Sequence, residues 1–364
     1  MTSCLLVINA GSSSIKASAF APGNLANLGH WQADLLASTP VWTGSGPAEP
    51  MPDTSPSRSM SALALILERA DLVPALVGHR IVHGGTVFVR PTEITDAVLT
   101  DLDSITPMAP LHNPPALAIL RQARSLFPHS RQVAMFDTAF HGTIPPVNYR
   151  YALPREWEER KGIRRFGFHG FSHAWSSGKA REILGEAQAK RVVVLHLGQG
   201  CSATAVLDGQ SHATTMGFTP LDGLPMGTRS GSVDPGALLH LLGGGDLGLA
   251  DLHKGLWRES GWLALSGISA NFREVLASAE AGNPRAVFAV EHLAARCRES
   301  VASMAAAMGG IDALVFTGGI GEHCAPLRAK VTEGLGFLRI PEGSVLVIPA
   351  EEERQMAMEM AALS

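Results

Sequence analysis

The sequence predicts an α/β protein built from two domains, and three observations support that prediction. The chain has 364 residues, and a domain with a single hydrophobic core is usually smaller than that. Short aliphatic runs typical of buried strands alternate with segments of helical periodicity. A strand, a glycine-rich turn and a second strand occur near the start of the chain and again near its middle. We expect domains at residues 1–145 and 146–364, with the last helix packing on the first domain as an alternative.

The composition excludes several classes of protein. Hydrophobic residues make up 46% of the chain and charged residues 17%, which is typical of a packed globular protein. A net charge of −4 leaves no basic excess for a nucleic-acid backbone. The 4 cysteines form no CxxC pair, so neither a disulfide framework nor a structural zinc site is expected. Without a basic leader or a long apolar stretch, we expect a cytoplasmic protein with no nucleic-acid or membrane partner.

The first strand pair is predicted at the start of the chain. Residues 5–8 are aliphatic and predict a buried strand, and the alternation over 15–20 predicts a second strand. The turn between them carries Gly11 and three serines, whose N–H and hydroxyl groups suit a phosphate site, and Lys16 follows it. A P-loop would show GxxxxGK[ST] before a helix, and neither feature is present. A plain hydrogen-bonded turn remains the alternative.

The second strand pair is predicted over residues 192–197 and 203–207, with a turn at 198–202. Its Gly-Cys-Ser sequence at 200–202 occupies the same place in the pair as Gly-Ser-Ser at 11–13. This correspondence indicates an internal duplication. Two unrelated hairpins remain the alternative.

The other elements follow from periodicity and from capping residues. Asn113 is expected to cap a helix with Pro114 in its first turn, and Asp234-Pro235 is expected to start another. Residues 21–58 are rich in Pro, Gly and Ser and are expected to be irregular. The remaining predictions are helices at 59–70, 114–127, 172–184 and 284–308, and buried strands at 313–316 and 345–348.

Two arginines stand among glycines and need anionic partners, because a guanidinium group keeps its proton. Arg80 lies in GHRIVHGG at 78–85, and Arg229 lies in LDGLPMGTRSG at 221–231. Two fixed guanidinium groups suit phosphoryl transfer, in which charge accumulates on the phosphoryl oxygens. For Arg80 an internal pair with a carboxylate is the alternative.

Two further polar residues adjoin element ends. His112 immediately precedes a predicted helix N-terminus, an end that attracts anions, although it could equally pack or cap. Asp137 follows the strand-like segment 133–136, and ligands of α/β folds gather at such strand ends. A metal-binding or orienting role for Asp137 competes with a structural turn cap.

The segment FGFHGFSH at 166–173 contains two histidines four residues apart. His169 and His173 would suit zinc if they shared a helix face, but Gly170 and the expected cap Ser172 indicate that the helix begins between them. A hydrogen bond from His169 to an oxyanion is therefore favoured. The glycines of FTGGIGE at 316–322 follow a predicted strand and would let a nucleotide approach the backbone.

Taken together, these segments resemble the acetate kinase (acetokinase) family in their order along the chain. The resemblance implies a two-domain fold like that of acetate and sugar kinases, Hsp70 and actin, with a duplicated β-sheet core and an interdomain cleft. The N-terminal domain would be the kinase domain and the C-terminal domain would bind nucleotide. The matching segments are VINAGSSSIK at 7–16, GHRIVHGG at 78–85, APLHNP at 109–114, FDTAFH at 136–141, RRFGFHG at 164–170, TPLDGLPMGTRSG at 219–231 and FTGGIGE at 316–322.

The resemblance also implies an activity. ATP would phosphorylate acetate, or propionate as an alternative, reversibly and in line, giving the acyl phosphate and ADP, with Mg²⁺ or alternatively Mn²⁺. A carboxylate is already a nucleophile, so the protein needs mainly to hold two anions together. A homodimer is implied as well. The alternatives are a non-catalytic nucleotide-binding relative and a metal-dependent hydrolase built on His169 and His173.

The resemblance assigns roles to residues that match the family motifs. The catalytic set it implies is Arg80, Asp137, His169 and Arg229. The substrate site it implies is Arg80, Val82, Leu111, His112, Phe168 and Pro220. The metal site it implies is Asn9 and Glu352, with the register of Glu352 open by one residue. The nucleotide site it implies is Ser12, Ser14, Lys16, His196, Gly198, Gln199, Gly200, Asn271, Phe272, Arg273, Gly318, Gly319, Ile320 and Gly321.

Several positions depart from the family pattern. Gln199 replaces an asparagine, Asn271 replaces an aspartate expected near the ribose, and His323 replaces another asparagine. All three lie on the nucleotide side, so the sequence predicts the acid substrate more firmly than the phosphoryl donor. Phe171 stands where threonine is usual, and the sequence offers no physical reason for it.

Overall fold

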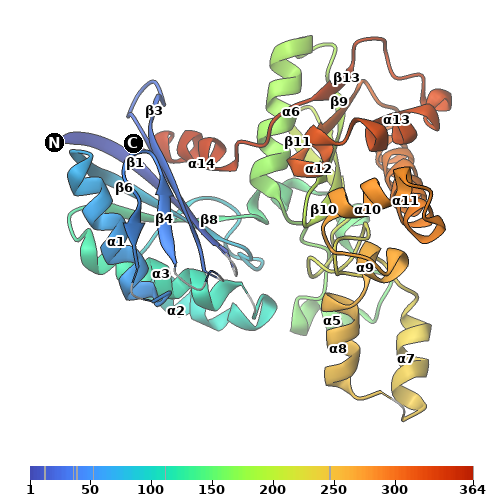
Figure 1. Cartoon of the computed structure of the whole chain (residues 1–364), viewed down its shortest axis with the longest axis horizontal. Helices are drawn as coiled ribbons and strands as arrows, with labels where there is room; N and C mark the ends of the chain where they lie inside the picture. Colours follow the sequence, from blue (N-terminus) through green and yellow to red (C-terminus); the bar gives the residue numbers. More distant parts are fainter. Residues whose placement is uncertain are drawn as a thin grey trace. The chain divides into compact units, whose positions relative to one another are not determined.

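The computed structural model describes residues 1–11, 14–35, 37, 40–51, 53–110, 112–245 and 247–363. Ser12 and Leu111, which the sequence assigned to the nucleotide and substrate sites, lie outside the described residues. The chain forms two compact units (Figure 1). Unit 1 contains residues 1–140 and 351–364, and unit 2 contains residues 141–350. Among the described residues, no helix is both long enough and apolar enough to span a bilayer.

The sheet of unit 1 combines antiparallel and parallel strands in the order β5-β4-β3-β2-β1-β6-β8-β7. Strands β1, β2, β3 and β4 are antiparallel neighbours, whereas β6 runs parallel to β1 and β8 runs parallel to β6. The strands are β1 (Thr2–Ala10), β2 (Ser14–Phe20), β3 (Asn27–Asp34), β4 (Val41–Gly44), β5 (Glu49–Pro50), β6 (Leu72–Ile81), β7 (Thr92–Glu93) and β8 (Arg131–Phe136).

Helices of unit 1 pack along this sheet. Helices α1 and α3 lie against each other and against β6, and α14 packs on β1 and β6 although it comes from the end of the chain. The helical segments are α1 (Pro56–Arg69), α2 (Asp96–Ser104), α3 (Asn113–Leu126), α14 (Glu352–Ala361) and the 3₁₀ segments η1 (Thr106–Met108) and η2 (Ala139–Thr143), the last of which crosses into unit 2.

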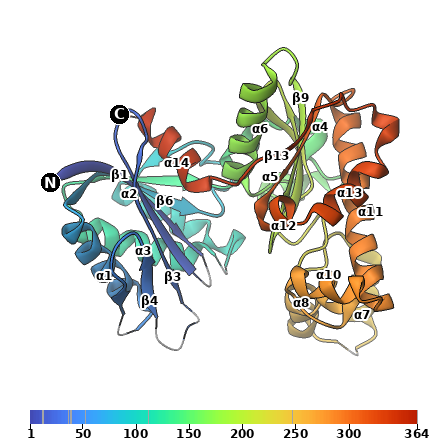
Figure 2. The same ribbon diagram turned by 45° about the horizontal axis from the view of Figure 1, so that its top comes forward.

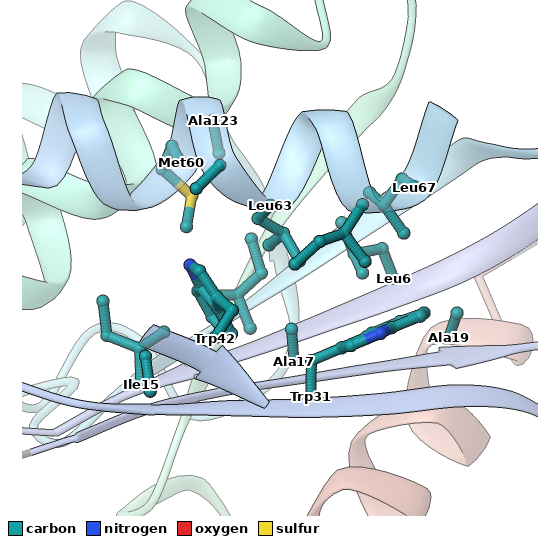
Figure 3. Close-up of a cluster of buried hydrophobic side chains, with 14 of the residues drawn as sticks. Leu6, Ile15, Ala17, Ala19, Trp31, Trp42, Met60, Leu63, Leu67 and Ala123 are labelled. Carbon is teal, nitrogen blue, oxygen red and sulfur yellow. The ribbon is translucent and has the colours of Figure 1, made fainter. Parts of the chain in front are cut away.

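Two tryptophans between the sheet and α1 anchor the core of unit 1 (Figure 3). Trp31 of β3 and Trp42 of β4 are buried, and the indole N–H of Trp42 donates to the carbonyl of Ser59 at 3.1 Å. The expectation that residues 21–58 are irregular is therefore wrong. The Gly- and Pro-rich composition reflects the turns that connect β3, β4 and β5, while the tryptophans of β3 and β4 supply the apolar face.

The sheet of unit 2 has the order β11-β10-β9-β12-β13. Its pairings repeat those of β3-β2-β1-β6-β8 in unit 1, with two antiparallel pairs followed by two parallel pairs. This match confirms the duplication that the two glycine turns predicted. The strands are β9 (Arg191–Leu197), β10 (Cys201–Leu207), β11 (Gln210–Thr214), β12 (Ala313–Thr317) and β13 (Val345–Val347).

Helices flank this second sheet, with α11 against β9, β10 and β11 and α6 against β9 and β12 (Figure 2). Helices α7 and α8 form a pair that projects from unit 2. The helical segments are α4 (Pro146–Tyr149), α5 (Arg155–Lys161), α6 (Gly170–Leu184), α7 (Pro235–Gly243), α8 (Leu249–Arg258), α9 (Gly261–Ser266), α10 (Phe272–Glu280), α11 (Pro284–Ala307), α12 (Gly318–His323), α13 (Ala325–Glu333) and η3 (Gly336–Leu338).

Three local expectations need correction. His112, not Asn113, occupies the N-cap of α3, because the Asn113 amide is used to bind both backbone groups of His83. Ser172 is not the cap of α6, since that helix already begins at Gly170. Strand β13 is an edge strand with Val345 and Val347 exposed, not a buried one.

Candidate functional site

The polar centre of unit 1 forms around Arg80 at the end of β6. Its Nε and Nη2 donate to the two carboxylate oxygens of Asp137 at 2.7 and 2.6 Å, a bidentate pair. Asp137 follows β8, the parallel neighbour of β6, so both residues leave the sheet at the same edge. The side chains are 18% and 3% exposed, which makes this a nearly dry ion pair.

Helix α14 adds two more carboxylates to this centre. Glu352 lies 3.4 Å from Nη1 of Arg80, and Glu353 accepts a hydrogen bond from the Asn9 amide at 3.0 Å. The Asn9 carbonyl accepts from Arg80 at 3.0 Å. Although burial acts to lower it, the facing carboxylates raise the pKa of Arg80, and burial raises the pKa of Asp137 against the pull of Arg80.

The remaining predicted residues of unit 1 that the structure describes lie on β2 or next to the ends of β6 and α3. Val82 directly follows β6, and Ser14 and Lys16 lie on β2, where Lys16 pairs with Asn9 across the strands. His112 stands at the N-cap of α3, and the side chain of the next residue fixes the backbone of His83. These five positions are partly buried or, in the case of Asn9, buried.

Unit 2 gathers a second polar centre around His169. His169 is the N-cap of α6 and has a φ of 58°, a left-handed conformation that non-glycine residues rarely adopt. Its Nδ1 lies 2.9 Å from the hydroxyl of Ser202 on β10, and Nε2 of His173 lies 2.7 Å from the same oxygen. Both imidazoles thus share one serine, so the pair is arranged for hydrogen bonding to protein. No metal-ligating group of three or more His, Cys, Asp or Glu occurs among the described residues.

A glycine loop brings this histidine close to Arg229. A methyl group placed on Gly200 would lie 2.8 Å from Nε2 of His169 and 3.7 Å from Nη2 of Arg229. The ring of His196 stacks on His169 with centroids 4.2 Å apart, and Nε2 of His196 lies 3.6 Å from the corresponding point on Gly198. Glycine at position 200 is therefore required for this approach of imidazole and guanidinium.

Arg229 differs from Arg80 in its partners. Its Nη1 donates to the carbonyl of Pro220 at 2.9 Å, and its guanidinium lies 5.9 Å from the ring of Trp257. Within the described part of the chain, no carboxylate forms an ion pair with it. Burial consequently lowers the pKa of Arg229, because its charge is largely removed from water without a fixed anion beside it.

Phe168, the residue before His169, belongs to the same polar centre. Its side chain is buried, and its carbonyl accepts a hydrogen bond from Nε2 of His141 at 2.9 Å. The Nδ1 of His141 then accepts from the Ser211 hydroxyl at 2.8 Å. Burial lowers the pKa of His141 to about 4, so this ring carries a single proton at neutral pH.

A cavity of about 230 Å³ in unit 2 adjoins the glycine loop. Seven residues predicted for the nucleotide site line it, and so does His323. The other four residues of unit 2 that were predicted for the nucleotide site, His196, Gly200, Gly318 and Gly321, do not line this cavity. The seven predicted residues that line the cavity are Gly198, Gln199, Asn271, Phe272, Arg273, Gly319 and Ile320.

Three lining residues of this cavity were missed by sequence reasoning, namely Trp262, Leu276 and Cys324. Trp262 is buried and its indole N–H donates to the carbonyl of Ala270 at 2.8 Å, which gives the cavity an aromatic wall. None of the three stands in a glycine-rich or charged motif, so no local signal marked them. Asn271 caps α10 through its carbonyl oxygen, which accepts from Arg273 N at 3.1 Å, while its amide donates to Glu274.

A larger cavity of about 470 Å³ lies elsewhere in unit 2 and holds none of the predicted residues. The basic groups that line it are engaged, since Arg165 binds two backbone carbonyls and Asp222, and Arg296 pairs with Glu299. Its size alone does not make it the reaction site. The smaller cavity is the one beside the polar centre.

Comparison with known proteins identifies the family. The model of the acetokinase family matches residues 4–355. The acetate kinase of Synechococcus sp. (strain JA-2-3B'a(2-13)) is 43% identical over 362 residues, covering 94% of this chain and 89% of that protein.

Solved structures agree with the sequence comparison. A propionate kinase from Francisella tularensis subsp. tularensis SCHU S4 matches with a TM-score of 0.91 at 35% identity, covering 98% of this chain and 99% of that one. The acetate kinase of Porphyromonas gingivalis matches with a TM-score of 0.91 at 34% identity over the full length of both chains. The predicted fold class, that of acetate and sugar kinases, Hsp70 and actin, is confirmed. From its motifs, its duplicated sheets and these relatives, the chain belongs to the acetokinase family.

Proposed function

We propose that this protein is an acetate kinase, which transfers the γ-phosphoryl group of ATP reversibly to acetate and produces acetyl phosphate and ADP. The observation that carries the proposal is the position of Arg229 beside His169. The Arg229 guanidinium is largely buried and has no carboxylate partner among the described residues. Such a group stabilises an arriving anion because it is already fixed and largely desolvated. The reaction itself is inferred from membership of the acetokinase family.

The proposed chemistry needs positioning more than proton transfer. The acetate carboxylate attacks the γ-phosphorus while the bond to the β-phosphate oxygen breaks, so no proton has to be removed from the nucleophile. We assign Arg80 and Arg229 to hold the carboxylate and the phosphoryl group, and His169 to donate a hydrogen bond to the phosphoryl oxygens. Asp137 orients Arg80 through its bidentate pair. Val82, Leu111, Phe168 and Pro220 are the proposed contacts for the short alkyl end, which suits acetate or propionate.

The proposed phosphoryl donor is a nucleoside triphosphate whose base and ribose occupy the cavity of about 230 Å³. Phe272, Ile320 and Trp262 offer apolar and aromatic surface of the kind that adenine needs. The glycines at 198, 200 and 319 leave room for phosphates near the backbone. Ser12, Ser14 and Lys16 are proposed to contact the same phosphates.

Magnesium is the proposed metal, held by Asn9 and Glu352. Mg²⁺ usually takes one or two carboxylates, with water and substrate phosphates completing its shell. The oxygen donors around Asn9, Glu352 and Glu353 fit that preference. When bound, the ion would neutralise charge on the transferred group. Mn²⁺ prefers similar ligands and is an expected substitute.

A homodimer in the cytoplasm is the proposed working form. Helix α7 buries none of its side chains, and Leu239 and Leu249 are 70% and 75% exposed. Leu241, Leu242 and Leu247 of the same segment are exposed as well, and a surface that exposes several large apolar side chains often marks a protein interface. Light scattering should give twice the chain mass for the native protein and a smaller mass for Leu239→Glu. A monomeric native protein would exclude the dimer.

The proposed activity is tested directly by trapping its product. The protein is incubated with ATP, MgCl₂ and acetate, and hydroxylamine converts any acyl phosphate to a coloured hydroxamate. We expect hydroxamate that depends on acid and ATP, with propionate as a second substrate. GTP and pyrophosphate in place of ATP establish the donor. ATP binding without hydroxamate from any short acid would instead support a non-catalytic relative.

A further inference from the structure

The hydrogen bonds of His169 and His173 in unit 2 indicate which ring nitrogens carry the protons. The Ser202 hydroxyl lies 2.9 Å from Nδ1 of His169 and 2.7 Å from Nε2 of His173. A hydroxyl has one hydrogen, so it donates to one of these nitrogens and accepts from the other. The direction of this short chain determines which nitrogen of His169 carries its proton.

The surroundings of His173 set that direction. His173 is fully buried, and burial lowers its pKa well below the usual value, so the ring carries one proton at neutral pH. Its Nδ1 is also buried and has no hydrogen-bond partner among the described residues. A proton on Nδ1 would leave a buried N–H unsatisfied, which proteins rarely tolerate. The proton therefore sits on Nε2, and His173 donates to Ser202.

With its oxygen accepting from His173, Ser202 donates its hydrogen to Nδ1 of His169. His169 then carries its own proton on Nε2. That atom would lie 2.8 Å from a methyl group on Gly200, and Nη2 of Arg229 would lie 3.7 Å from the same point. An imidazole N–H and a guanidinium N–H consequently border the same glycine.

We propose that Ser202 and His173 are positioning residues that keep His169 in the tautomer whose Nε2–H faces Gly200. The inference rests on the proposed function for its catalytic meaning, because an N–H there donates to a phosphoryl oxygen whereas a bare nitrogen would repel it. Ser202 lies on β10, directly opposite His196 of β9, and His173 lies on the first turns of α6. Both supports are therefore carried by regular elements, as the left-handed backbone of His169 requires.

The first test reads the tautomer itself and needs no activity. Nitrogen-15 spectra of the imidazole rings, assigned to His169 through a His169→Gln variant, should show Nε2 protonated and Nδ1 bare in the intact protein at neutral pH. In Ser202→Ala the signals should move toward a mixture of both tautomers. A protonated Nδ1 in the intact protein, or unchanged signals in Ser202→Ala, would overturn the proposal.

The second test separates donation by His173 from simple packing. The amide nitrogen of Gln can replace Nε2 of His173, whereas Phe fills the site without a donor. We expect His173→Phe and Ser202→Ala to lower kcat by about ten- to one hundredfold with little change in KM, and His173→Gln to restore most of the rate. Equal losses in His173→Gln and His173→Phe, with thermal unfolding unchanged, would contradict a positioning role.

The two tests distinguish this inference from the proposed function. If the protein phosphorylates no acid but the spectra show the expected tautomer, the hydrogen-bond chain stands and the acetate kinase proposal fails. If it phosphorylates acetate but the spectra show Nδ1 protonated, the chain is wrong and the proposed function stands.

Discussion

Arg80 in unit 1 and Arg229 in unit 2 occupy opposite electrostatic situations. Arg80 is held by a bidentate pair with Asp137 and by a second carboxylate, that of Glu352 on α14. Arg229 is held by a backbone carbonyl and lies near an aromatic ring, with no carboxylate partner among the described residues. One guanidinium is neutralised within the fold, and the other still requires an anion.

This difference separates two uses of the same side chain. A neutralised arginine is rigid, and its removal leaves the partner carboxylates buried without compensation. An uncompensated arginine costs the folded state free energy that a bound anion recovers. Arg80 should therefore matter for stability and activity together, and Arg229 for activity alone.

The largest effect is expected from Arg80→Gln. Loss of the guanidinium leaves Asp137 buried and unpaired, so the free energy of unfolding should fall by about 3–5 kcal/mol, and hydroxamate formation should be lost. Urea unfolding monitored by tryptophan fluorescence, to which the buried Trp31 and Trp42 of unit 1 contribute, measures the stability. Adding Asp137→Asn removes the orphaned charge and should recover stability without activity. Failure of the double variant to recover would mean that Arg80 acts on the fold by another route.

Arg229→Gln should lower kcat/KM by about 10²- to 10³-fold, the range seen when one oxyanion donor is removed. The free energy of unfolding should stay the same or rise, since an uncompensated charge is removed. Steady-state assays and urea unfolding are run on the same preparation. Arg229→Lys keeps the charge but loses the planar fork, so an intermediate rate is expected. A stability loss as large as that of Arg80→Gln would abolish the contrast.

The Gly200→Ala variant tests the close approach of His169 to Gly200 within unit 2. The added methyl would lie 2.8 Å from Nε2 of His169, so the ring must move, and we expect kcat to fall by about ten- to one hundredfold. Gly198→Ala is the matched variant, because its methyl meets nothing closer than 3.6 Å and should cost less. Equal rates for the two variants would show that the approach at Gly200 is not limiting.

Acid should destabilise unit 2 more than unit 1. Burial lowers the pKa of His141 and of His79 to about 4, and that of His173 falls well below its usual value. Between pH 6.5 and about 4 the unfolded chain binds more protons than the folded one, so the free energy of unfolding falls as pH falls. From pH 7 to 5 the loss is about 2 kcal/mol for His141 and about the same for His79.

Two of these histidines lie in unit 2 and one lies in unit 1, which makes the difference measurable. Hydrogen exchange of peptides from β9 and β10 is compared with that of β1 and β6 at the two pH values, after correction for intrinsic rates. Protection should fall further in β9 and β10. An equal loss in both units would contradict the assignment of these buried rings.

The smallest effect is expected from Gly178→Ala in α6, the helix whose N-terminus carries His169. A methyl group there meets nothing within 4 Å, and the position is exposed. Removal of glycine from a helix interior should raise the free energy of unfolding by about 0.5–1 kcal/mol. Thermal unfolding and the acetate assay should show higher stability with an unchanged rate. A lower rate would mean that α6 must flex for turnover.

Local sequence patterns predicted most of the central elements. Both glycine-turn hairpins, the long helix α11 and the buried strand β12 follow from period, composition and capping residues. The same signals failed over residues 21–58, because β4 has only four residues and the buried face of β3 carries one large apolar side chain, Trp31, whose burial depends on packing against α1. Periodicity over so few residues cannot reveal a distant partner.

The sequence by itself determined that two arginines need anions, that glycines border the site and that one aspartate ends a strand. It also determined the family, because those segments occur in a recognisable order. Only the tertiary structure decided that Asp137 neutralises Arg80 across 57 positions, that Arg229 has no such partner among the described residues, and that Ser202 joins His169 to His173. The physical reason is that hydrogen bonds and ion pairs act over a few ångströms, and strand pairing brings residues within that range irrespective of their separation along the chain.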